Sequence, residues 1–271
     1  MASSHPLSPN TRTKENLITS LKALALLIST NFQIKITFRY DILTGLLGIF
    51  VEVFVLRQLW ISLYNGREVY AGVNLDQMLT YAAMSMIISR LFVSYVVEDV
   101  NRLIRNGDII FYLTRPMDYM FFLFFSELGR TLAMFVTTSV PMFIVVCLMY
   151  KLILPTSVVV WFAFFVSLAF GYMISFMIEY LTTLLGFWVT EISGIALSKQ
   201  VLISILGGAY IPIWIFPSYV EKLVLLLPFR TISYTPLAIL IGKVGFDQIP
   251  VELGIQVIWT IILFCLSKLF Y

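Results

Sequence analysis

Charged residues are scarce in this sequence. Asp, Glu, Lys and Arg make up 12 % of its 271 residues, whereas a soluble domain usually carries about 25 %. The apolar remainder, 60 % of the chain, is more than one soluble core can hide, so the composition argues against an ordinary water-soluble protein. The net charge of +3 is weak and no basic stripe alternates with aromatic residues, so we expect no nucleic-acid partner.

The residue types that usually hold metals or perform catalysis are also scarce. The single histidine, His5, lies in the N-terminal tail, and both cysteines, Cys147 and Cys265, lie inside apolar runs without metal-ligand spacing. A phosphate-binding Gly-x-x-x-x-Gly-Lys-Ser/Thr loop is missing, since the pair Gly242–Lys243 lacks both the upstream glycine and the hydroxyl. We therefore expect a chain that is not an enzyme and binds no metal or cofactor.

Long apolar runs fill most of the chain instead. Runs of about 20 residues are typical of transmembrane helices, and their number predicts an all-α polytopic membrane protein with six spans. The predicted spans are residues 42–64, 78–97, 120–150, 158–188, 195–213 and 251–270. We expect a disordered tail at 1–11, an amphipathic interfacial helix at 12–40 and one six-span domain at 41–271.

In the segment 12–40, Leu24, Ile28 and Phe32 share one helical face while Lys22 and Lys35 keep largely to the other. This pattern is typical of a helix in the membrane interface.

The distribution of basic residues predicts the orientation. Most basic residues outside the spans fall on the N-terminal side of the membrane. Because basic residues stay on the cytoplasmic side, we expect a multi-pass plasma-membrane protein with both termini in the cytoplasm.

The stretch "RNGDIIFYLTRPMD" interrupts the apolar pattern between the second and third spans. We expect a short amphipathic helix at the cytoplasmic surface, weakened by Gly107 and ended by Pro116. A solvated loop that only carries the cytoplasmic positive charge is the alternative. The candidate docking residues are Arg102, Arg105, Gly107, Asp108, Leu113, Arg115 and Pro116.

The region between the fifth and sixth spans is apolar yet broken by Pro and Gly. Irregular backbone at membrane depth persists only when it is buried in protein or faces a cavity. We expect two short helices, 218–227 and 236–243, which form an outer re-entrant pair. A helix that merely rests on the bilayer is the alternative.

Six of the charged residues inside predicted spans are candidates for a role within the membrane, where each costs roughly 2.5–3.5 kcal/mol on insertion scales. One interpretation is helix–helix ion pairs, such as Arg90 with Glu52 or Glu179, and Glu127 with Arg130 three residues later. The other is a polar lining of a transport path. The residues are Glu52, Arg57, Arg90, Glu127, Arg130 and Glu179.

Two stretches resemble permease subunits of type-2 ABC exporters. "GDIIFYLTRPMD" matches the run before their third span at Gly107, Leu113, Arg115 and Pro116. "GGAYIPIWIFPSYVEKLVLLLPFRTISYTPLAILIG" is similar to their final outer region. The matching residues there are Pro212, Phe216, Pro217, Leu227, Pro228, Phe229, Pro236 and Gly242.

The resemblance implies a subunit that performs no chemistry and is driven by a partner. The interrupting stretch would be the coupling helix that docks on a separate ABC ATPase, and ATP and Mg would bind in that ATPase. A second permease, identical or homologous, would pair with this chain within the lipid bilayer of a bacterial inner membrane. The implied outer gate is Pro212, Phe216, Pro217, Pro228, Phe229 and Pro236, and the implied dimer seam is Gly45, Gly48, Gly207 and Gly208.

The expected function is therefore ATP-driven export by alternating access, and the apolar, aromatic composition favours a lipophilic or amphipathic cargo such as a drug, lipid or peptide. An ion-coupled secondary transporter is the alternative, but it would need a midplane site of clustered carboxylates and internal repeats, which are not evident. A membrane-embedded enzyme would need converging His, Asp or Cys groups.

Overall fold

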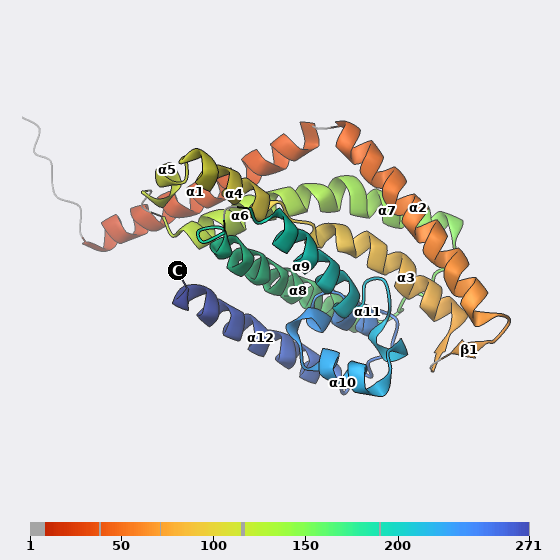
Figure 1. The fold of residues 1–271 in the computed structure, drawn as a ribbon. Coiled ribbons are helices and arrows are strands. Elements are labelled where there is room, and N and C mark those ends of the chain that lie inside the picture. The colour runs from red at the N-terminus through yellow and green to blue at the C-terminus, as the bar shows by residue number, and fades with distance from the viewer. Residues whose placement is uncertain (1–8, 38, 71, 115–116, 190, 271) are drawn as a thin grey trace, which may run out of the picture.

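The computed structural model describes residues 9–37, 39–70, 72–114, 117–189 and 191–270. These residues form an elongated bundle in which the long helices lie roughly alongside one another (Figure 1). The α-helices are α1 (Pro9–Thr37), α2 (Arg39–Tyr64), α3 (Leu75–Ser89), α4 (Val96–Asn106), α5 (Ile110–Leu113), α6 (Tyr119–Met134), α7 (Val140–Met149), α8 (Val158–Leu185), α9 (Ser193–Leu206), α10 (Ser218–Leu225), α11 (Tyr234–Leu240) and α12 (Ile249–Leu269). The shorter elements are the 3-10 helices η1 (Arg90–Phe92), η3 (Ile213–Ile215) and η4 (Pro228–Thr231), the π-helix η2 (Phe135–Ser139), and strands β1 (Val69–Tyr70) and β2 (Val73–Asn74).

Five helical segments of the described chain are long and apolar enough to cross a membrane. They are Ile42–Tyr64, Leu75–Asn106, Tyr119–Met149, Val158–Leu185 and Ile249–Leu269. The prediction of a polytopic helical membrane protein is thus confirmed. Apolar runs locate these helices well because each must supply its own backbone hydrogen bonds across the bilayer.

The third span contains a π-helix just before Pro141. Pro141 lies in the first turn of α7 and cannot donate a backbone hydrogen bond. The five π-helical residues Phe135–Ser139 precede it, and such a wider turn accommodates the interrupted bonding within a continuous helix.

The second span differs from its prediction. Instead of one helix at 78–97 followed by a separate short helix, α3 ends at Ser89, η1 follows, and α4 already begins at Val96. Gly107 adopts a left-handed conformation (φ 79°) and ends α4, so it separates two helices, α4 and α5, rather than lying inside one. Glycine adopts this conformation without the steric cost that a Cβ brings.

The predicted fifth span, 195–213, is also shorter than expected. Helix α9 has 14 residues and so spans about 21 Å, less than the roughly 30 Å of a hydrocarbon core. Gly208 turns the chain with φ 77°, and η3, α10, η4 and α11 follow as short pieces. The described residues therefore contain five full-length spans and one short apolar helix instead of six uninterrupted spans.

The short pieces after α9 are anchored in the bundle. Helix α11 packs on α8, and its residues Thr235 to Leu240 are buried. Their close approach depends on Gly171 of α8, since a Cβ there would lie 2.7 Å from the Ile232 carbonyl oxygen. The region resembles the predicted re-entrant pair in its bounds, with α10 and α11 close to 218–227 and 236–243.

Helix α1 lies along α6 and has a half-buried face that includes Leu24, Ile28 and Phe32. Gly129 of α6 permits the contact, because a Cβ at this position would come within 2.4 Å of the Ile28 carbonyl oxygen. The predicted tail overlaps the helix, which begins at Pro9, while residues 1–8 lie outside the described residues. The position of α1 in the membrane interface stays a prediction.

Candidate coupling site

Helix α4 presents two faces. Val96, Val97 and Val100 are at most 1 % exposed, and Val97 packs with Ile192 and Ala196 at the start of α9. The opposite face carries the polar residues, with the acidic side chains in the first turn, where the helix dipole favours them. The apolar face therefore anchors α4 to the bundle and leaves its charges free to bind neighbouring elements.

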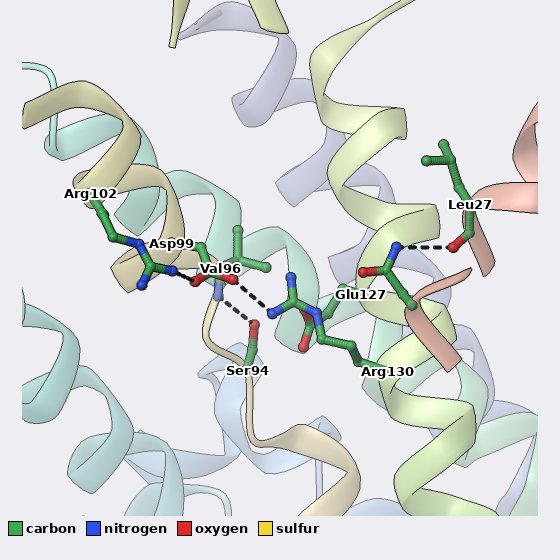
Figure 2. A network of polar contacts seen from close by, with 8 residues as sticks. Leu27, Ser94, Val96, Asp99, Arg102, Glu127 and Arg130 are labelled. Atoms are coloured by element: carbon green, nitrogen blue, oxygen red, sulfur yellow. Dashed lines mark hydrogen bonds and ion pairs between the residues drawn. The ribbon is translucent and has the colours of Figure 1, made fainter. Parts of the chain in front are cut away.

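Asp99 links α4 to the third span, as Figure 2 shows. Its Oδ2 accepts a hydrogen bond from Arg130 Nη1 of α6 at 2.8 Å, and its Oδ1 accepts one from Arg102 Nη2 at 2.5 Å. Arg130 Nε also lies 3.1 Å from Glu127 Oε2. Two carboxylates thus share the Arg130 guanidinium, whose planar donors suit such bridging.

Arg105 connects α4 with the segment before α9. Its Nη1 lies 3.1 Å from Glu191 Oε2, and both side chains are more than half exposed, so this pair adds little stability. The Ser193 hydroxyl and backbone N–H donate to Glu191 and lower the pKa of this carboxyl. Glu191 is thereby held as a carboxylate that faces Arg105.

The tip beyond Gly107 is apolar and exposed. Ile110, Phe111 and Leu113 of α5 are 62 %, 69 % and 43 % exposed, while Ile109 beside them is buried. Exposed apolar side chains grouped at the end of a charged element are typical of a protein-binding surface. Asp108 is exposed in the same turn; the predicted site residues Arg115 and Pro116 lie outside the described residues.

The last turn of α12 ends beside the same region. Lys268 pairs with Asp118, whose side chain accepts hydrogen bonds from the backbone N–H groups of Met120 and Phe121 and so caps α6. Partial burial raises the pKa of Asp118, but the Lys268 ammonium and these N–H groups outweigh it and lower the pKa. The C-terminal end of α12 therefore lies at the α4 end of the bundle.

Four of the intramembrane charges form two ion pairs that agree with the predictions. Arg90 Nη2 lies 2.7 Å from Glu52 Oε1, which selects Glu52 over Glu179 as its partner, and Glu127 pairs with Arg130. Glu179 instead pairs with Lys199 of α9, with both side chains nearly buried. Arg57 lies over the ring of Tyr150, 5.1 Å from its centroid. The interpretation of these charges as helix–helix pairs thus fits the geometry, and a role in a path stays a prediction.

The predicted outer-gate residues lie at the end of the bundle opposite α4. Pro212 and Pro236 are buried, Phe216, Pro228 and Phe229 are half-buried, and Pro217 is exposed. The irregular backbone there is satisfied by α3, since the Tyr81 hydroxyl donates to the Gly208 carbonyl at 2.6 Å and Ser85 Oγ donates to the Ala209 carbonyl at 2.5 Å. This is the condition under which non-helical chain persists at membrane depth.

Polar contacts also fix η4 against the last span. The Gln256 amide donates to the carbonyl oxygens of Ser167 and Thr231, at 3.0 and 2.8 Å. Arg230 Nη1 lies 3.2 Å from Glu252. The gating role itself stays a prediction.

The glycines predicted for the dimer seam face this chain's own interior. A Cβ at Gly48 would lie 3.6 Å from Arg90, one at Gly45 would lie 3.7 Å from Thr138, and Gly208 is enclosed by Tyr81. A Cβ at Gly207 would lie 3.1 Å from the Phe229 carbonyl oxygen. The seam stays a prediction, and the exposed apolar side chains of α2 offer one surface for it.

Several residues of the site were missing from the predicted set. Asp99 was recognisable by its i, i+3 spacing from Arg102, which the predicted docking set did include. Asp118 was recognisable by its place just before an apolar run, where a helix cap is expected. Lys199 falls inside the predicted span 195–213 but is not among the predicted intramembrane charges. Only the folded chain brings Asp99 to Arg130, because 31 residues separate them.

The fold defines a polytopic helical membrane protein. At one end of the bundle, α4 contacts α6 and α9 and leads into the exposed helix α5. A family model described as "ABC-2 family transporter protein" matches residues 49–271, and the chain belongs to this family. It is therefore a membrane component of an ABC transporter, a permease that is not itself catalytic, in a family that normally works with an ATPase partner. No curated protein and no solved structure matches the chain.

Proposed function

We propose that this chain is the membrane-spanning permease subunit of an ATP-driven exporter, and that α4 and α5 dock on a separate cytoplasmic ATPase. The observation that supports this most is the link between an exposed apolar tip, α5, and an ion pair that joins α4 to α6. In this arrangement ATP and Mg bind in the ATPase, and the permease changes conformation in response.

The contacts of α4 suggest how motion passes into the membrane. A displacement of α5 moves α4, because only the turn at Gly107 separates them. Helix α4 then acts on α6 through Asp99 and Arg130, and on α9 through Val97 and Ile192. The docking element therefore contacts both α6 and α9.

The assembly that we propose contains two permeases, identical or homologous, and two ATPases in a bacterial plasma membrane. Both termini lie in the cytoplasm, and α10, η4 and α11 close the path on the outer side. The lipophilic or amphipathic character of the cargo is supported by the apolar cavities between the spans.

The docking is tested with Phe111→Asp, in a permease co-expressed with its ATPase. A charge at this apolar contact is expected to weaken co-purification of the ATPase at least tenfold, the loss that one central contact residue produces. Val69→Asp is the matched control, since Val69 is 58 % exposed in the β1–β2 hairpin at the end of the bundle away from α5. Equal ATPase recovery with both variants would contradict the docking assignment.

A further inference from the structure

A continuous apolar groove runs between the third and fourth spans. One cavity of about 370 Å³ lies between α6 and α8, and another of about 190 Å³ lies between η2, α7 and α8. Leu91, Phe135, Phe165 and Leu168 line both cavities, so the two form one groove. No charged residue of the described chain lines either of them.

The groove has an open side and a closed floor. Helix α8 packs on α11, α12 and α4, whereas α6 packs on α1. The floor of the groove between α6 and α8 includes residues of α3 and η1. Its walls are rich in aromatic rings, among them Phe124, Phe135 and Phe165. Such a groove is suited to an elongated apolar or aryl group that enters from the side.

One end of this groove leads to a carboxylate. A small pocket shares Phe92, Thr131 and Tyr172 with the larger cavity and is also lined by Glu127. The Glu127 side chain is 4 % exposed. A buried carboxylate at the end of an apolar groove is costly unless a positive charge accompanies it.

The positive charge present at this end is shared. Arg130 pairs with both Glu127 and Asp99, and Arg102, the other partner of Asp99, is 68 % exposed. The buried Glu127 carboxylate therefore shares the Arg130 guanidinium with Asp99, whose side chain is 35 % exposed. The rings of Phe92, Phe176 and Tyr172 surround the pocket, and aromatic faces attract cations.

We propose that this groove binds lipophilic cations, with the apolar body between α6 and α8 and the cationic head at the end of the larger cavity lined by Thr131 and Tyr172, next to the pocket of Glu127. The inference deepens the proposed function by naming a cargo class, and as a statement about transport it rests on that function. The buried Glu127 carboxylate favours a cation over a neutral lipid, and it would repel an anionic amphiphile.

The test measures binding to the purified permease in nanodiscs of neutral lipid, without ATPase or ATP. The probes are pyrenylbutyl-trimethylammonium and its uncharged analogue pyrenylbutanol, which have the same apolar body. Binding is followed by energy transfer to pyrene from tryptophan, since Trp161 lines the groove. We expect the cation to bind at least about tenfold more tightly, the difference that one buried charge pair produces.

Three variants locate the site. Glu127→Gln should remove the preference for the cation, and Leu168→Trp, which fills both cavities, should weaken both probes. Glu252→Gln is the matched control, because it removes a carboxylate from an arginine pair at the other end and should keep the preference. Equal affinity of the two probes for the unaltered protein, or a preference that survives Glu127→Gln, would overturn the proposal. Neither result would bear on ATPase docking, so the two proposals fail separately.

Discussion

Single glycines decide how closely the chain can pack on itself. Gly129 places the α6 backbone against Ile28 of α1, and Gly171 places α8 against Ile232. At both positions the neighbour is a carbonyl oxygen of the backbone, which cannot rotate away as a side chain would. These residues therefore set distances between elements rather than local helix stability.

Gly129→Ala is expected to destabilise the protein by about 1–3 kcal/mol, the usual cost of inserting a group into filled space. Gly254→Ala in α12 is the control, because a Cβ there meets no atom within 4 Å. That variant should be neutral or stabilising, since alanine is the better helix former. Thermal unfolding in detergent measures both, and equal midpoints would show that α1 does not rest on Gly129.

At the scale of elements, the link between α4 and α6 depends on one ion pair. Asp99→Asn and Arg130→Gln, made singly and together, form a double-mutant cycle. We expect a coupling free energy of about 1 kcal/mol in unfolding, because both side chains are partly exposed and solvent screens the pair.

The same variants should lower transport more than they lower ATP hydrolysis, since the motor would still dock on α5 while its motion reached α6 less effectively. Transport and hydrolysis are measured in parallel in reconstituted vesicles. A proportional fall in both would contradict a role for this pair in transmission.

The sequence predicted those helices whose position depends on a single rule, the apolar length that a membrane span requires. Full spans followed from apolar length alone, and the bounds of the third and sixth are within two residues of the prediction. The end of α4 and the short length of α9 were not predicted. Gly107 and Gly208 end these helices with positive φ angles, and whether a glycine adopts such an angle depends on how the surrounding elements pack. Pairings such as Lys199 with Glu179 depend on which helices meet, which apolar runs do not encode.

At the scale of the molecule, the ion pairs of α4 and of the end of α12 lie at one end of the bundle. The α4 network, the Asp118–Lys268 pair and the end of α12 lie there, while the hairpin and α10 lie at the other end (Figure 1). With basic residues on the cytoplasmic side, this polarity predicts that α5 is cytoplasmic and α10 is external.

Membrane-impermeant maleimide tests this orientation in a background without Cys147 and Cys265. Leu226→Cys, at a position 72 % exposed next to α10, should be labelled in intact cells. Phe111→Cys should be labelled only after the membrane is opened. The reverse pattern would place the docking element on the wrong side for an ATPase.

The hydroxyl groups of Tyr81 and Ser85 have a consequence for hydration during the transport cycle. They hold the carbonyl oxygens of Gly208 and Ala209 in a dry environment. Any movement that lifts this segment off α3 exposes two strong acceptors, and solvent must satisfy them before the displaced conformation can persist. We therefore expect water to enter the α10 end of the bundle whenever this segment separates from α3.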